Sequence, residues 1–197
     1  MSSKILEMIA GQLDENALRQ ISKQLGADEE GTQKAVTAAL PLLLNALDRE
    51  AAEPEGAQAL ANALRRDHSG NILQDVTAAL ANDATRQDGE AILGHVLGSR
   101  RSSVEKGLGQ VAGLDPGSTG QLLSMLAPLV MGALGRVQQE EDLDAGGVSN
   151  FLTREREETD SELSGVARLL DLDGDGNVSD DLLNIGSNLL GGFFKKR

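Results

Sequence analysis

Two stretches of the chain are apolar on nearly every side of a helix. They are Thr32–Arg49 and Thr119–Arg136, and leucine recurs through both without a sustained polar face. A helix that is apolar all round belongs in a protein core. Each run is shorter than the roughly 20 residues of a membrane span. Pro41 and Pro128 lie inside the runs, where a proline removes a backbone donor and crowds the preceding turn. The pattern predicts two buried helices, bent or split at proline.

Shorter helical patterns flank these runs. Apolar residues recur at helical spacing in Ile5–Gly11, Asp14–Leu25, Ala57–Leu64 and Ile72–Leu80. Gly26 is expected to end a helix, and Asp28 or Thr32 to cap the first long one. The polar stretch Asn82–Gly89 is expected to be a connector. Since no segment alternates apolar and polar residues with a period of two, the predicted fold class is all-α.

An internal repeat organises the chain. A shift of 87 positions (128 minus 41) places Ile5–Arg49 on Ile92–Arg136 without a gap. The identical pairs include Gly26/Gly113, Asp28/Asp115, Thr32/Thr119 and Pro41/Pro128. Compositional bias does not readily align glycine, Asp, Thr and Pro together. We therefore expect a helical core over residues 1–139, made of two tandem repeats at about 5–76 and 92–137 that pack through their apolar final helices.

The remainder of the chain is expected to divide into two parts. Residues 140–162 are acidic, and Thr153–Glu158 (TREREE) is typical of a solvated helix or a linker. Residues 163–197 are predicted to form a helix, an Asp-rich loop and a second helix. Gly176–Leu182 (GNVSDDL) resembles Gly70–Val76 (GNILQDV), so the second repeat would contain the acidic stretch as an insertion.

The Asp-rich loop is the one candidate metal site. Asp171–Leu182 reads DLDGDGNVSDDL and begins like an EF-hand calcium loop, D-x-D-x-D-G. Its candidate ligands are the carboxylates of the aspartates, the backbone carbonyl of Asn177 and a water held by Ser179: Asp171, Asp173, Asp175, Asn177, Ser179, Asp180 and Asp181. The twelfth position, normally a bidentate Glu, is Leu182, so calcium binding should be weak, with a Kd on the order of 10⁻⁴ M or higher, and magnesium is a possible substitute. The alternative is an Asp/Gly turn that caps the exit helix.

These motifs together carry a resemblance. LPLLLNAL, PEGAQAL, DHSGNILQD, DGEAILGHVLG, LAPLVMGALG and the final LLDLDGDGNVSDDLL resemble the bacterial "domain of unknown function" family 937. The resemblance runs from about Gly26 to the C-terminal glycines. It implies a helical architecture and a bacterial source, but it does not point to a catalytic site.

The composition of the chain argues against nucleic acids and membranes as binding partners. The net charge is −13, which disfavours nucleic acid and anionic membranes. The chain has no Trp, no Tyr and three Phe, so it lacks the aromatic platforms of single-stranded nucleic-acid binders. It has no cysteine, in keeping with a reducing cytoplasm. The N-terminal MSSKILEMIAGQL makes a poor signal peptide. We expect a soluble cytoplasmic protein without a membrane span.

Motifs for catalysis are missing from the sequence. It has no G-x-S-x-G, no P-loop and no dinucleotide-binding glycine fingerprint. The only histidines, His68 and His95, lie in different elements, with His68 expected in an exposed turn and His95 against a packing surface. We therefore expect a non-catalytic helical scaffold or interaction protein, self-associating or binding another protein. The alternative is an enzyme whose site is assembled from scattered carboxylates and amides.

Overall fold

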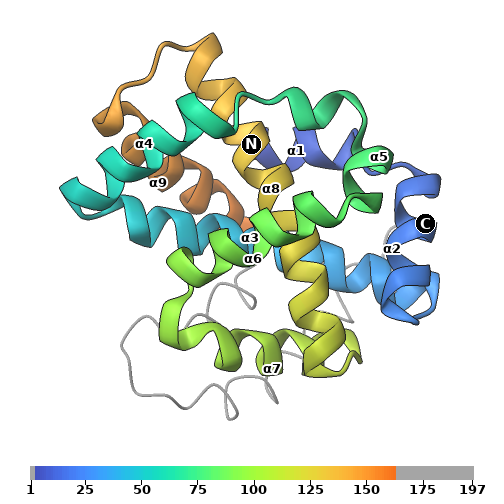
Figure 1. Cartoon of the computed structure of the whole chain (residues 1–197). Helices are drawn as coiled ribbons and strands as arrows, with labels where there is room; N and C mark the ends of the chain where they lie inside the picture. Colours follow the sequence, from blue (N-terminus) through green and yellow to red (C-terminus); the bar gives the residue numbers. More distant parts are fainter. Residues whose placement is uncertain (1–2, 163–197) are drawn as a thin grey trace.

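The computed structural model describes residues 3–162, and within them the protein is helical throughout (Figure 1). The elements are α1 (Lys4–Ala10), α2 (Glu15–Leu25), α3 (Glu29–Ala51), α4 (Pro54–Asp67), α5 (Val76–Ala81), α6 (Asp83–Val96), α7 (Arg101–Ala112), α8 (Pro116–Glu140) and α9 (Ala145–Glu162), with short 3₁₀ turns at Asn71–Gln74 and Gly98–Arg100. No strand occurs among these residues, and the all-α prediction is confirmed. The helix–loop–helix expected at 163–197 lies outside the described range.

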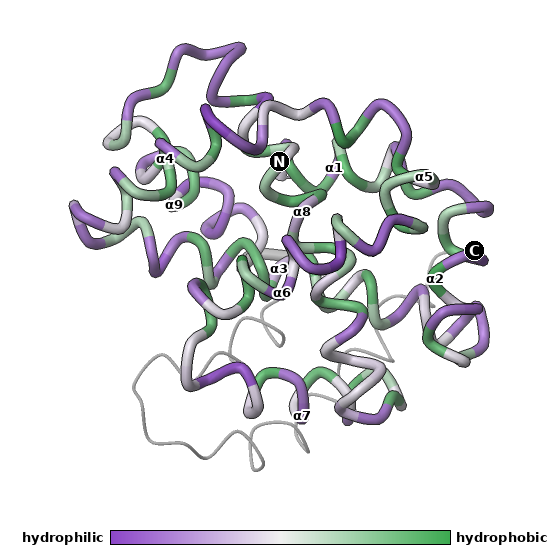
Figure 2. Tube along the Cα trace, viewed as in Figure 1, coloured by the Kyte–Doolittle hydropathy of each residue, from purple (hydrophilic) through white to green (hydrophobic). Residues whose placement is uncertain are grey.

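Helices α3 and α8 are the two apolar runs, and they form the centre of the core. Helix α8 packs against α1, α3, α4, α6 and α7. By length and composition it could cross a membrane, and 89% of its most apolar 18-residue stretch is buried inside the protein. Both helices continue through their prolines, and Pro41 and Pro128 are themselves buried. Hydrophilic residues gather in the loops and at the outer ends of the helices (Figure 2).

Capping residues begin α3 and α8 and end the helices before them, as the sequence predicts for Gly26 and Asp28. The carboxylates of Asp28 and Asp115 cap α3 and α8 by accepting N–H groups of their first turns. Gly26 (φ 64°) and Gly113 (φ 71°) end α2 and α7 in the left-handed region, where a side chain is disfavoured. In both places a glycine ends the shorter helix, and the Asp two residues later begins the long core helix.

Helix bounds follow the 87-residue shift in two of three cases. Shifted by 87, α2 becomes 102–112 and α3 becomes 116–138, close to the bounds of α7 and α8. Shifted α1 becomes 91–97, which is only the last part of the longer α6. The tandem repeat itself stays a prediction, and superposing the two units is its test.

The stretch Asn82–Gly89 is not a connector. It is the first half of α6, which begins when the Asn82 side chain accepts the Ala84 N–H. Gly89 lets α6 lie directly on α8, since a Cβ at this position would overlap the backbone carbonyl of Ser124. Close packing with α8 therefore decides the conformation of a stretch whose composition is polar. The predicted helix Ile72–Leu80 is also interrupted, because Asp75 caps α5 partway along it.

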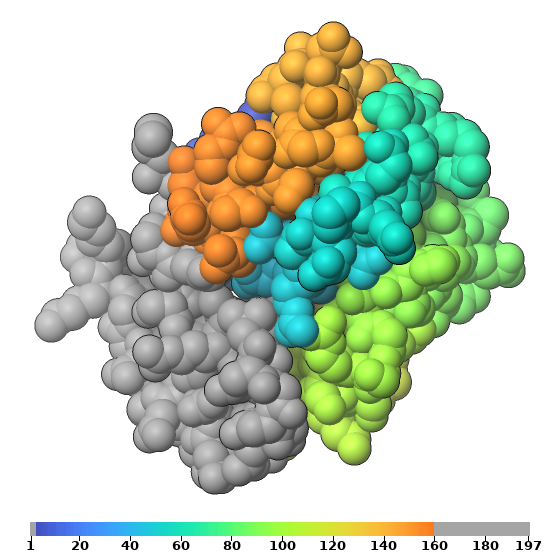
Figure 3. Space-filling model, turned by 90° about the vertical axis from the view of Figure 1, so that its left-hand side faces the viewer, coloured from blue at the N-terminus to red at the C-terminus, as the bar shows by residue number. Residues whose placement is uncertain are grey.

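Residues 145–162 form a helix, but it is not a solvated one. Helix α9 lies along α3 and α4, as Figure 3 shows on one face of the molecule. Val148, Phe151 and Leu152 are buried at helical spacing, and the charged TREREE stretch follows them directly. Glu155 within this stretch is only 5% exposed. The short apolar stripe before the charges sets the orientation of the helix.

Candidate functional site

The predicted calcium ligands lie outside the described residues. Asp171, Asp173, Asp175, Asn177, Ser179, Asp180 and Asp181 all belong to this C-terminal part. Within residues 3–162, no three or more His, Cys, Asp or Glu side chains come together in a way that could hold a metal ion. The loop therefore stays a candidate on its sequence motif alone.

The two histidines lie differently from the prediction. His68 was expected in an exposed turn, but its side chain is 10% exposed, and Nδ1 lies 3.8 Å from an Asp88 carboxylate oxygen. Its backbone carbonyl lies against Gly135 of α8, where a Cβ would overlap it. His95 was expected against a packing surface and is exposed instead. The close approach of α4 to α8 buries His68.

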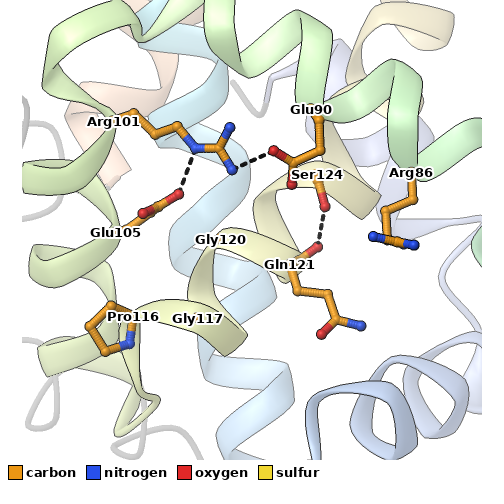
Figure 4. Close-up of a pocket in the computed structure, with 9 residues that line it drawn as sticks. All are labelled: Arg86, Glu90, Arg101, Glu105, Pro116, Gly117, Gly120, Gln121 and Ser124. Carbon is orange, nitrogen blue, oxygen red and sulfur yellow. Dashed lines mark hydrogen bonds and ion pairs between the residues drawn. The ribbon is translucent and has the colours of Figure 1, made fainter.

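A polar cleft opens where α6 and α7 meet the N-terminal half of α8 (Figure 4). Its volume is about 340 Å³. We call it the polar cleft, and its lining is Arg86, Glu90, Arg101, Glu105, Pro116, Gly117, Gly120, Gln121 and Ser124. Close packing at Gly89 positions α6, so that Arg86 and Glu90 come to the side of α8.

A chain of ion pairs crosses the cleft. The Arg101 guanidinium binds Glu90 at 2.6 Å and Glu105 at 2.7 Å (Figure 4). The hydrogen bond to Glu105, and then the one to Glu90, raises the pKa of Arg101 despite partial burial. Gly120 makes room for this network, because a Cβ there would come within 2.7 Å of a Glu105 oxygen. The network holds α6 to α7 and engages both carboxylates with one guanidinium.

The N-terminus of α8 borders the cleft but is already capped. The Asp115 carboxylate accepts the N–H groups of Gly117 and Ser118 at 2.9 and 3.1 Å. The hydroxyl of Ser118 donates to it at 2.6 Å and is the main cause that lowers the pKa of Asp115. Since the helix supplies its own anion, these N–H groups are not offered to a ligand.

The remaining polar groups show what the cleft can do chemically. The buried Ser124 hydroxyl donates to the Gln121 backbone carbonyl at 2.8 Å, so it is not aligned with a base as a nucleophile would be. Arg86 pairs with Asp83 at 3.0 Å, on the exposed surface. Figure 4 shows the Arg86 guanidinium and the Gln121 amide on the side of the cleft opposite Arg101 and Glu105. The arrangement is suited to polar contacts rather than to acid–base chemistry.

Sequence reasoning missed this cleft. Its signals were the four-residue spacings Arg86/Glu90 and Arg101/Glu105, which place each pair on one face of a helix. Arg86 lay in the stretch interpreted as a connector and Glu90 directly after it, and the two helices come together only through tertiary packing.

Most of the described chain matches a known protein family. The family described as "Bacterial protein of unknown function (DUF937)" matches residues 7–137. Neither the curated proteins nor the solved structures include a significant match. The matched range contains the polar cleft and ends before α9.

Proposed function

The chain belongs to this bacterial family of unknown function, and we propose that it is a non-catalytic helical scaffold that binds copies of itself or another protein. One observation carries the proposal. All four charged side chains that line the polar cleft are engaged in ion pairs: Arg86 with Asp83, and Glu90 and Glu105 with Arg101. A general acid or base must reach the proton that it transfers. These side chains are instead held by their ion-pair partners.

The packing of the core also supports a scaffold. Every Val, Ile, Leu, Met and Phe among residues 3–159 is buried or partly buried. The helices thus cover their apolar faces with one another and present a polar surface of acidic character. Rigid helices with polar outer faces are suited to holding partners, and a net charge of −13 favours protein partners over nucleic acid.

This packing changes the basis for self-association. Among residues 3–159 the two leucine-rich helices and their neighbours leave no Val, Ile, Leu, Met or Phe fully exposed as an apolar docking surface. Association therefore needs polar contacts or the exchange of an element that is already packed. A cytoplasmic location without a membrane span is part of the proposal and rests on composition.

A weak calcium site at Asp171, Asp173 and Asp175 is also part of the proposal, on the motif alone. Calorimetric titration with calcium should give heat for the wild-type chain and markedly less for Asp173→Ala, because the loop loses one of its carboxylates. Equal heats for the two chains, or none at millimolar metal, would leave the helix-capping turn as the better account. Magnesium in the same titration reports whether the smaller cation substitutes.

Light scattering on the full chain, with and without calcium, tests the scaffold proposal. The mass should rise above that of one chain as protein concentration increases. A monomeric mass at every concentration in both conditions would overturn self-association. Turnover of a substrate that depends on Arg101 or Glu105 would overturn the non-catalytic assignment.

A further inference from the structure

Helix α9 is held on the rest of the domain by two sets of polar contacts, one around the buried Glu155 and one around the half-buried Asp48. The Glu155 carboxylate accepts the Ser3 hydroxyl and the N–H groups of Lys4 and Ile5, the latter two at 3.1 and 2.9 Å. It therefore joins α9 to the start of α1. On α3, Asp48 accepts the Thr153 hydroxyl and the Arg156 guanidinium, each at 2.8 Å. We call this set the α9 latch: Ser3, Asp48, Thr153, Glu155 and Arg156.

Helix α9 packs on distant parts of the chain rather than on its neighbour in sequence. Its main contacts are with α3 and α4, although it directly follows α8. The face that it covers therefore depends on α9 for burial. It does not depend on which copy of the chain supplies α9.

Helices α4 and α9 bury matching positions of their sequences. A shift of 91 residues places α4 on α9, and the four buried positions of α4 match four buried positions of α9. They are Ala57/Val148, Leu60/Phe151, Ala61/Leu152 and Leu64/Glu155. Helix α4 follows α3 and packs on both α3 and α8, while α9 follows α8 and packs on α3 and α4. Thus α4 and α9 each reach the long helix that does not directly precede them, α8 and α3 respectively.

The connection before α9 carries the features of a hinge. It consists of the four residues Glu141–Asp144. Asp142 has φ 51° and is the one non-glycine residue with positive φ in the described part of the chain. Gln138 is 2% exposed and donates to the carbonyls of Ala61 and Leu143, but its Oε1 accepts no hydrogen bond from described residues. The strained backbone of Asp142 destabilises the closed turn, while the Gln138 amide holds it by donating to the Leu143 carbonyl.

We propose that two copies of this chain associate by exchanging α9, with each α9 latch formed between chains. The inference rests on the proposed self-association and specifies its surface. Exchange needs no exposed apolar patch, because the dimer reuses the interface of the monomer. Opening the hinge also releases Asp142 from its left-handed conformation.

Substitutions of Asp142 in the full chain test the hinge. Asp142→Gly removes the strain of the closed turn and should lower the dimer association constant roughly fivefold, while Asp142→Ala keeps the strain and should not lower it. Sedimentation equilibrium measures both. Asp142→Ala is thus the control for Asp142→Gly at the same position. If Asp142→Gly leaves the association constant unchanged, the proposed role of the hinge is wrong.

Cross-linking identifies the interface, since the chain has no native cysteine. Asp48→Cys and Thr153→Cys chains are mixed, partly unfolded, refolded at high concentration and treated with a short thiol cross-linker. A covalent dimer is expected from this pair. Asp48→Cys mixed with Asn150→Cys, on the exposed face of α9, should give much less. The double variant Asp48→Cys/Thr153→Cys reports the contact within one chain.

The outcomes separate the inference from the proposed function. A covalent dimer in the mixture, in excess of the Asn150→Cys control, supports exchange. A dimeric mass by light scattering with cross-linking only inside the double variant would overturn exchange and leave self-association standing. A monomeric mass together with an intramolecular cross-link would overturn both.

Discussion

The polar cleft and the α9 latch join helices with the same residue types but in different surroundings. In the cleft, Glu90 binds Arg101 with its side chain 41% exposed. In the latch, Glu155 is 5% exposed and accepts a hydroxyl and two backbone N–H groups. An exposed ion pair adds little to stability because water and salt compete with it. A buried carboxylate with several donors leaves those donors unpaired when it is removed. The latch, rather than the cleft, is therefore the polar region on which the fold depends.

Removing the apolar anchor of α9 should have the largest effect. Phe151 is buried between α9 and the helices that it covers. Phe151→Ala should lower the free energy of unfolding by about 3–5 kcal/mol, because it removes a large side chain and leaves a cavity. Chemical denaturation measures this change. A loss below about 1 kcal/mol would mean that α9 contributes little to the domain.

Replacing Gly89 tests whether the close packing of α6 on α8 shapes the polar cleft. Gly89→Ala would place a Cβ on the Ser124 carbonyl and force α6 away from α8, with an expected loss of about 1–3 kcal/mol. A Cβ added at Gly94, on the same helix, would meet no atom within 4 Å, so Gly94→Ala is the matched control. It should stabilise the protein by up to about 1 kcal/mol. Equal effects of the two substitutions would contradict backbone packing as the cause.

The smallest expected effect is on how stability changes with pH, through Asp115 at the edge of the cleft. The folded-state pKa of Asp115 is lowered, chiefly by the Ser118 hydroxyl. Its stabilising effect is therefore complete above the unfolded pKa of about 3.9 and is lost as pH falls through the lower folded value. Asp115→Asn keeps a capping side chain without a charge, so any advantage of wild type over this variant should shrink below about pH 4. Denaturation at neutral and acidic pH, with NMR titration of Asp115, checks the sign.

Much of the core could be predicted from sequence because its signals are local. The apolar runs of α3 and α8, their Asp caps and the glycines that end α2 and α7 all depend on neighbouring residues. The cleft and the latch could not be predicted in this way. Glu155 lies in a run of charges that is typical of solvent, and its donors come from the other end of the described chain. In the Asn82–Gly89 stretch, the close fit of Gly89 against α8 likewise depends on a distant part of the chain.

The same chemical change in both regions tests the central comparison most directly. Glu155→Gln and Glu90→Gln each replace a carboxylate by an amide of similar shape. In the latch, the amide pairs with fewer of the three donors, so we expect a loss of about 2–3 kcal/mol. In the cleft, Arg101 keeps Glu105, and we expect about 0.5 kcal/mol or less.

Urea denaturation of the two variants beside wild type gives this comparison in one experiment. We expect Glu155→Gln to lower the free energy of unfolding at least about threefold more than Glu90→Gln does. Equal losses, or a larger loss for Glu90→Gln, would contradict this ranking and would make the polar cleft the region on which the fold depends.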